Sequence, residues 1–179
     1  MSHLPSLPEK ANLVDVYKAY PKLAKATLSF AEAAVSFTDE LSKAECELLG
    51  TYVSALNECT YCQNVHAEVA AFCEMDREKL ANTDAMASYG GDRWAPIFAY
   101  VKLLTLNPAS VTETHVQAIL QQGWSEDVVV QITALASTFA VLNRTVEGLG
   151  LQGDSDFFKA SGERLGSIGY GGTMTKLGL

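Results

Sequence analysis

Apolar side chains recur every three or four residues along most of the chain, which is the spacing of one face of an α-helix. Alternating β-branched runs, which indicate strands, are nearly absent, and Val128-Val129-Val130 lies inside a longer helical pattern. The pattern therefore predicts an all-α fold. Capping and stop signals predict helices at about 11–18, 21–36, 42–56, 59–74, 76–81, 94–106, 112–122, 125–148 and 154–165.

The two ends of the chain have a different composition from the helical middle. Residues 1–10 contain prolines and are predicted to form an extended arm, and residues 166–179 form a glycine-rich tail for which the pattern predicts no element. A length of 179 residues suits one domain with a sizeable core. We therefore expect residues 1–179 to form a single domain.

Composition and charge narrow the class of protein. Apolar residues make up 48% of the chain and charged residues 19%, as in an ordinary soluble globule. The net charge of 13 − 21 = −8 argues against nucleic acid or an anionic membrane as partner. Apolar runs are interrupted before the roughly 18 residues that a membrane span needs, and the N-terminus does not resemble a secretory signal. We expect a cytoplasmic protein.

The strongest chemical signal is Cys59-Thr60-Tyr61-Cys62-Gln63-Asn64-Val65-His66. On a helix, Cys59 and Cys62 are i,i+3 neighbours, and Cys62 and His66 are i,i+4 neighbours, so the three side chains share one stripe. Two thiols that can form a disulfide then lie beside a base that titrates near neutral pH. This arrangement favours thiol redox chemistry.

The motif leaves two other interpretations open. A structural zinc site needs four protein ligands, and no second Cys pair is present, although a Cys2His site with an open position stays possible. A purely structural role is the other alternative. Cys46 and Cys73 occur singly and are expected to be small buried apolar residues. Redox chemistry is favoured over both.

The predicted helix 42–56 has a wide apolar face and a narrow polar strip formed by Glu47, Thr51 and Ser54. Periodicity alone predicts that Glu47 is a solvated residue on this strip. It does not choose between Glu47 and Glu45 as a partner for His66. The broad apolar surface of this helix also favours a homo-oligomer.

Glu47, Cys59, Cys62 and His66 together resemble the Glu-x(11)-Cys-x-x-Cys-x-x-x-His signature of the alkyl hydroperoxide reductase D (AhpD)-like family, within the carboxymuconolactone decarboxylase superfamily. Leu142-Asn143-Arg144 resembles a feature of its peroxidase-related branch, and the resemblance covers about residues 20–150. It implies an all-helical fold, assembly as a trimer or hexamer, and a thiol-dependent hydroperoxidase or disulfide reductase that needs no cofactor or metal. The substrate would be a hydroperoxide and the reductant an external dithiol or a thioredoxin-like protein.

The resemblance also implies a role for each residue of the signature. Cys62 would attack the peroxide, Cys59 would resolve the sulfenic acid into a disulfide, and His66 with Glu47 would relay the proton. Position along the helix also favours Cys62, because it is one turn from His66 whereas Cys59 is two turns away. Cys59 is then expected to be the thiol more accessible to a reductant.

One position departs from the family pattern, since Tyr61 stands where the best-studied members have a histidine. The role of that histidine is then lost or taken over by a phenol. Two alternative functions remain. The first is a carboxymuconolactone decarboxylase-like lyase, which the cysteine pair disfavours because the decarboxylase branch lacks it. The second is a non-catalytic redox sensor or metal-binding scaffold.

Overall fold

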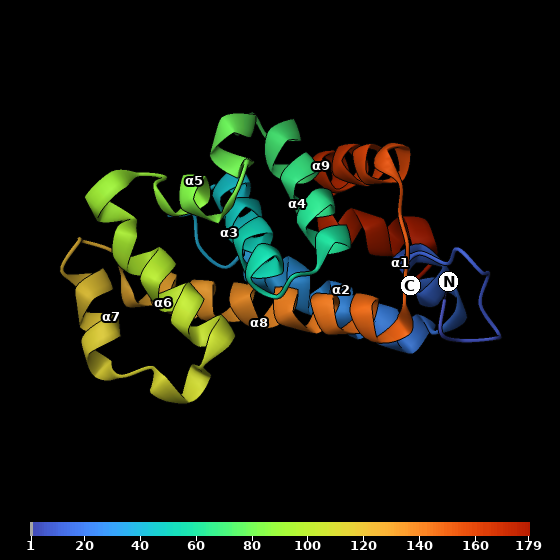
Figure 1. Ribbon diagram of the computed structural model, residues 1–179, viewed down its shortest axis with the longest axis horizontal. Coiled ribbons are helices and arrows are strands. Elements are labelled where there is room, and N and C mark those ends of the chain that lie inside the picture. Colours follow the sequence, from blue (N-terminus) through green and yellow to red (C-terminus); the bar gives the residue numbers. More distant parts are fainter. Residues whose placement is uncertain (1) are drawn as a thin grey trace.

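The computed structural model describes residues 2–179, and every regular element in this part of the chain is helical (Figure 1). The predicted all-α class is therefore confirmed. The α-helices are α1 (Leu13–Ala19), α2 (Pro21–Val35), α3 (Lys43–Leu56), α4 (Thr60–Phe72), α5 (Thr83–Ala87), α6 (Ala95–Leu106), α7 (Glu113–Leu120), α8 (Glu126–Leu149) and α9 (Ser155–Leu177). The 3-10 helices are η1 (Arg77–Leu80), η2 (Gly91–Arg93) and η3 (Pro108–Ser110).

Most helix starts follow from side chains that bond the free backbone N–H groups of the first turn. Asn12 and Ser42 open α1 and α3 with reciprocal capping boxes, the latter with Glu45. Ser125 and Asp154 cap α8 and α9 by accepting from Val128 and Phe157. These starts agree with the predicted ones. The segment predicted as helix 76–81 is the short 3-10 helix η1, and α5 was not predicted.

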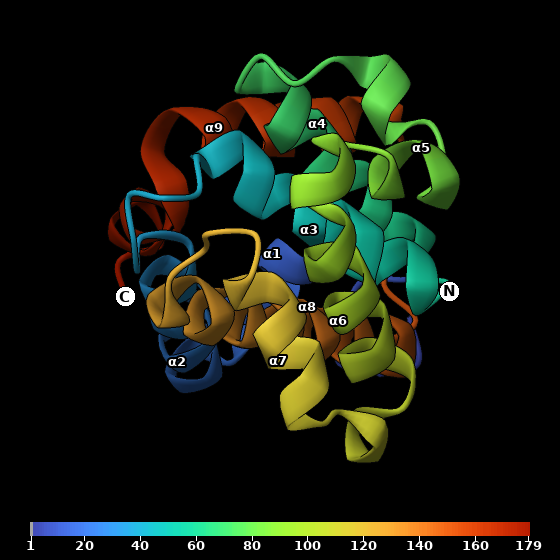
Figure 2. The same cartoon turned by 90° about the vertical axis from the view of Figure 1, so that its left-hand side faces the viewer.

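Helix α3 lies in the middle of the molecule, with α4 and α9 on one side and α8 with α2 on the other (Figures 1 and 2). Helices α6 and α7 complete the far end of the bundle. Within α3, every residue from Cys46 to Ser54 is buried, including the whole strip of Glu47, Thr51 and Ser54. The prediction of a solvated strip is therefore wrong, because neighbouring helices cover α3 on all sides.

Helix α9 continues twelve residues beyond the predicted end at Leu165, to Leu177. It changes direction at Gly169, whose φ of 67° and ψ of −173° fall in a region that is essentially open to glycine only. Lys43 donates to the carbonyls of Leu165 and Gly166 before the break, and the Glu32 carboxylate accepts from the N–H of Gly171 after it. These contacts replace helical hydrogen bonds around the break, and glycine composition alone did not reveal them.

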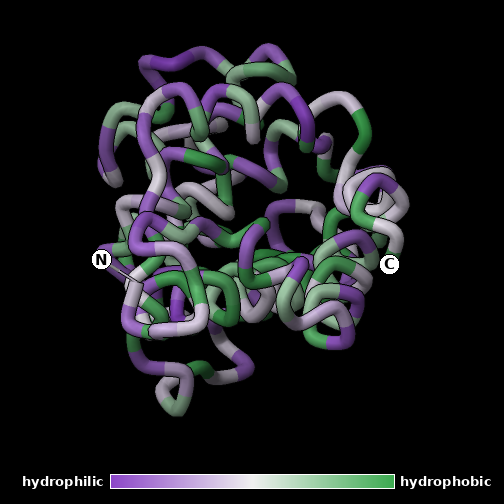
Figure 3. Tube along the Cα trace, turned by 90° about the vertical axis from the view of Figure 1, so that its right-hand side faces the viewer, coloured by the Kyte–Doolittle hydropathy of each residue, from purple (hydrophilic) through white to green (hydrophobic). Residues whose placement is uncertain are grey.

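One helix, α8, is long and apolar enough to cross a membrane by length and composition, but more than half of its most apolar window is buried within the bundle. Core helices of soluble proteins pass the same test. Along the chain trace, hydrophobic stretches lie mostly within the bundle and hydrophilic residues follow its outer loops (Figure 3). The structure is that of a soluble-looking helical domain with α8 as a core helix.

Candidate active site

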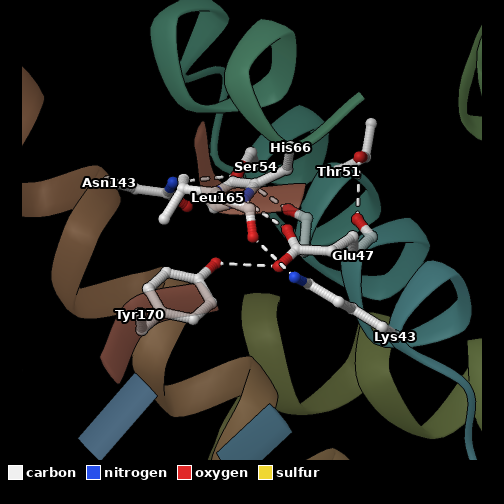
Figure 4. A network of polar contacts seen from close by, with 9 residues as sticks. Lys43, Glu47, Thr51, Ser54, His66, Asn143, Leu165 and Tyr170 are labelled. Atoms are coloured by element: carbon white, nitrogen blue, oxygen red, sulfur yellow. Dashed lines mark hydrogen bonds and ion pairs between the residues drawn. The ribbon is translucent and has the colours of Figure 1, made fainter. Parts of the chain in front are cut away.

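A buried acid–base pair joins α3 to α4. Glu47 Oε2 accepts a hydrogen bond from His66 Nδ1 at 2.8 Å, and the two side chains are 0% and 3% exposed (Figure 4). Glu45, the alternative partner, instead closes the capping box of α3 and accepts from Tyr89. Because Glu47 occupies Nδ1, the other nitrogen, Nε2, is the one left free to take a proton.

Glu47 has a second partner, which comes from the far end of the chain. The hydroxyl of Tyr170 donates to Glu47 Oε1 at 2.9 Å, and Tyr170 is itself buried (Figure 4). Burial and the neighbouring Glu47 carboxylate raise the pKa of Tyr170 well above its usual value, so this hydroxyl remains a donor. Both carboxylate oxygens of Glu47 therefore have hydrogen-bond donors, which a buried carboxylate requires.

The two cysteines of the motif lie at the start of α4, in the reduced form. A hydrogen bond from the Cys59 thiol is the largest cause that lowers the pKa of Cys62, against the raising effect of burial, and His66 and Asn143 lower it further. The same hydrogen bond, with burial, raises the pKa of Cys59. Cys62 is therefore the thiol that ionises first.

The two thiols also differ in their relation to the cavity. Cys59 is 0% exposed, whereas Cys62 is 2% exposed and lines a cavity. Both thiols are buried, so the structure does not support the expectation that Cys59 is the more accessible one. Cys59 is the N-cap residue of α4, and its N–H donates to the Ser54 carbonyl at the end of α3, which holds it inside the α3–α4 junction.

Asn143 of α8 connects the thiols to α3. Its amide nitrogen donates to the Ser54 hydroxyl at 3.0 Å, and its amide oxygen accepts from Asn57 at 2.9 Å. It is 2% exposed and close enough to Cys62 to lower the pKa of that thiol. Its neighbour Arg144 points outward and bonds only the Ala140 carbonyl. Of the two residues, Asn143 belongs to the site.

The imidazole of His66 is also fixed by an aromatic contact. The Phe139 ring stands nearly edge-on to it, with ring centroids 4.5 Å apart. That position is possible because residue 50 is glycine, since a Cβ there would lie 2.6 Å from the tip of the Phe139 ring. Gly50 therefore makes room for the residue that packs against the base.

Cys62 and His66 line one small cavity between α1, α4, α8 and α9, with a volume of about 60 Å³. This is room for a few water molecules. The remaining walls are mostly apolar and aromatic and include Leu13, Tyr17, Tyr61, Leu142, Phe157 and Tyr170. A small substrate in this cavity would meet the thiol and the base together.

Tyr61, which departs from the family pattern, is part of this wall. Its hydroxyl accepts from the backbone N–H of Leu13, the first residue of α1, and its ring packs against Phe157 and Phe158. Burial raises the pKa of Tyr61. The phenol therefore holds α1 against α4, and it is not a proton carrier at neutral pH.

The other candidate residues lie outside the site. Cys46 is buried beside Gln131, and burial raises its pKa to about 12. Cys73 is half-buried at the end of α4. His115 bonds Thr112 in the cap of α7. Among residues 2–179, no three His, Cys, Asp or Glu side chains are grouped so as to hold a metal ion.

Three residues of the site were not found from the sequence, namely Tyr170, Tyr17 and Arg164. Tyr17 and Arg164 line the cavity, and both the Tyr17 hydroxyl and Arg164 Nε are buried without a hydrogen-bond partner. All three are far from the Cys motif in sequence, so periodicity could not associate them with it. The one local signal was an aromatic residue placed between glycines at Gly169-Tyr170-Gly171.

Comparison with known proteins supports the resemblance that the motif suggested. Residues 21–103 match the model of the carboxymuconolactone decarboxylase family. The matched segment runs from α2 into α6 and contains Glu47, Cys59, Cys62 and His66. No curated protein sequence matches the chain.

The fold is shared with several solved structures. A peroxidase-related protein from Silicibacter sp. TM1040 is 18% identical, with a TM-score of 0.73 over 82% of this chain and 78% of its own. An AhpD-core, peroxidase-related protein from Ralstonia eutropha JMP134 is 20% identical, with a TM-score of 0.72 over 80% and 77%. A cysteine-to-alanine variant of the debrominase Bmp8, solved with 2,3,4-tribromopyrrole, is 17% identical, with a TM-score of 0.69 over 85% and 81%. At these identities the likeness establishes an AhpD-like helical fold.

Proposed function

We propose that this protein is a thiol-dependent hydroperoxidase or disulfide reductase that uses the Cys59–Cys62 pair. The observation that carries the proposal is the meeting of Cys62 and His66 in one small cavity, with Glu47 and Tyr170 buried behind the base. A thiol whose pKa is lowered is the nucleophile that peroxide reduction requires.

In the proposed reaction, the Cys62 thiolate attacks one peroxide oxygen and the O–O bond breaks. His66, protonated at Nε2 by the Cys62 thiol, returns that proton to the leaving alkoxide, which departs as an alcohol. Cys59 then attacks the sulfur of the Cys62 sulfenic acid, so that an S–S bond forms and water leaves. An external dithiol reduces this disulfide by exchange and is itself oxidised.

The buried position of Cys59 fits the resolving role better than the attacking one. Its raised pKa keeps the thiol protonated until the neighbouring sulfur becomes electrophilic. The external dithiol would attack the sulfur of Cys62, which faces the cavity, and release Cys59 as the leaving thiol. This order differs from the one predicted from the sequence, in which Cys59 was the thiol accessible to the reductant.

Single-turnover thiol titration tests the proposal. One equivalent of hydroperoxide should consume two thiols in the native protein. Cys62→Ser should consume none, and Cys59→Ser should leave a sulfenic acid on Cys62 that a dimedone-type reagent traps. Cys73→Ser is the control, because Cys73 lies outside the cavity, and it should behave like the native protein. Consumption of Cys46 or Cys73 by peroxide would contradict the assignment.

A second candidate function is reductive dehalogenation of an aromatic ring. It is favoured by the aromatic walls of the cavity, which include Tyr17, Tyr61 and Phe157, and by the fold shared with a debrominase. Two thiols would supply two electrons and two protons as they form the disulfide. One proton replaces bromine on the ring carbon, and the other is released with bromide. Bromide release from a brominated pyrrole or phenol, absent in Cys62→Ser, would support this activity over peroxide reduction.

We also propose that the protein forms a homo-oligomer in the cytoplasm. The apolar surface of α3 does not support this assembly, because α3 is buried within its own chain. Some of the exposed large apolar side chains lie instead on α2 and α8, namely Leu23, Phe30, Val130 and Val141. Light scattering should return a multiple of the 19.3 kDa chain mass. A monomer at micromolar concentration would contradict this proposal.

A further inference from the structure

The active-site cavity is lined by two polar groups that the proposed chemistry does not use. Arg164 of α9 lines this cavity, and its Nε is buried without a hydrogen-bond partner. Its Nη2 donates one long hydrogen bond, to the hydroxyl of Ser161 at 3.4 Å. Tyr17 lines the same cavity, is 5% exposed, and its hydroxyl also has no partner. Buried polar groups usually have partners in a folded protein, so two orphans in one cavity point to a ligand.

Arg164 also belongs to a second hollow on the outside of the same wall. This groove, of about 260 Å³, is lined by Val14, Lys18, Arg164, Thr173, Lys176 and Leu177. It shares Val14, Arg164 and Thr173 with the inner cavity. The guanidinium therefore stands between the reacting thiol on one side and the surface groove on the other.

The groove is strongly cationic in a chain whose net charge is −8. Three of its lining side chains are Lys18, Arg164 and Lys176, and none is an aspartate or glutamate. Within residues 2–179 these three cations take part in no ion pair, since the ion pairs of this part of the chain join His66 to Glu47 and Arg77 to Glu68. Three uncompensated cations around one hollow attract an anion.

We propose that this groove binds the anionic head group, a carboxylate or a phosphate monoester, of an organic substrate whose reacting end occupies the inner cavity. The identity of the reacting end as a hydroperoxide rests on the proposed function. The apolar walls beside Leu13, Leu142 and Phe157 accept the carbon chain, and Lys18 and Lys176 hold the charge outside. Arg164 and the Tyr17 hydroxyl supply donors between the two ends. The substrate is therefore a short amphipathic anion, and hydrogen peroxide is a poor one.

The test compares a short-chain hydroperoxy acid with its methyl ester, which lacks the negative charge and adds one methyl group. The native protein should show a lower KM for the acid, by roughly 2- to 30-fold for two exposed cation–anion pairs. In the double variant Lys18→Met/Lys176→Met the ratio of the two KM values should fall towards one. The matched control is Lys25→Met/Lys102→Met, which removes the same charge from exposed positions on α2 and α6 and should keep the ratio. High salt should also lower the ratio in the native protein.

Calorimetry measures ligand binding to the groove without turnover. The ligands are the corresponding hydroxy acid and hydroxy ester, which are the alcohols that reduction would produce. Tighter binding of the acid, lost in the Lys18/Lys176 variant, supports the site, and repeating the titration with the phosphate monoester identifies the preferred head group. Equal KM values with equal binding of acid and ester would overturn the site and leave peroxide reduction standing. Selective binding of the hydroxy acid without turnover of either peroxide would refute the proposed function and retain the anion site. Neither binding nor turnover would refute both.

Discussion

The polar groups behind His66 and those in the cavity wall differ in how they are satisfied. Behind His66, Glu47 bonds both His66 and Tyr170, and Asn143 bonds Ser54 and Asn57. In the cavity wall, the Tyr17 hydroxyl and Arg164 Nε have no partner. A fully satisfied network keeps one geometry, whereas donors without partners gain free energy when a ligand supplies acceptors. The network behind His66 is thus organised for chemistry before substrate arrives, and the donors of the cavity wall are organised by the substrate.

The largest expected effect is a difference in alkylation rate between Cys62 and Cys46, a thiol buried elsewhere in the core. The pKa of Cys62 is lowered, whereas that of Cys46 is raised to about 12. Near pH 7, Cys62 should be alkylated about 30- to 1,000-fold faster than Cys46, because each pKa unit changes the thiolate fraction tenfold and part of this is offset by lower nucleophilicity. Peptide mapping after timed alkylation with a small reagent measures both rates. Equal rates would show that the hydrogen-bonded groups around Cys62 and His66 do not activate Cys62.

The second effect concerns the carboxylate that holds the base. Glu47→Gln keeps the shape of the side chain but removes the charge that stabilises protonated His66. Alkylation of Cys62 should slow by about 5- to 150-fold, which corresponds to about 1–3 kcal/mol. His66→Ala should be at least as slow, and the double variant little slower than His66→Ala, because the two residues act as one unit. Additive effects would contradict a relay.

A pair of tyrosine variants compares a buried hydroxyl that has a partner with one that has none. Tyr170→Phe removes a donor to a buried carboxylate and should lower the free energy of unfolding by about 1.5–3 kcal/mol. Tyr17→Phe removes a buried hydroxyl that has no partner, so the free energy of unfolding should stay unchanged or rise. Urea denaturation of both variants measures the difference. Equal destabilisation would mean that the Tyr17 hydroxyl already has a partner in solution.

The smallest expected change in unfolding free energy comes from a substitution at the break in α9, which brings Tyr170 to Glu47. Gly169→Ala places a side chain at φ 67° and ψ −173° and should cost about 1–3 kcal/mol of unfolding free energy. Gly148→Ala is the matched control, because a Cβ at Gly148 in α8 would meet no atom within 4 Å. It should be neutral or stabilise by up to about 1 kcal/mol. If both variants unfold alike, residue 169 does not need glycine.

Cys46 makes the stability of the fold depend on pH. An unfolded thiol loses its proton near pH 8.5, whereas folded Cys46 keeps it up to about pH 12. The unfolded state therefore binds fewer protons across this range, and the contribution of Cys46 to stability is lost as the pH rises from about 8.5 towards 12. Cys46→Ala should lessen this alkaline loss, which urea denaturation at several pH values would detect.

Local sequence signals were enough to predict the all-α class, most helix starts, and the grouping of Cys59, Cys62 and His66, because capping and helical periodicity act within a few residues. It could not determine that Glu47, Thr51 and Ser54 are buried, because a polar strip looks the same whether water or another helix covers it. Nor could it bring in Tyr170, which lies 123 positions from Glu47. These points depend on long-range packing, because α9 and α1 pack against α4 and bring distant residues to one cavity. The same packing encloses Cys59 and leaves Cys62 on the cavity wall.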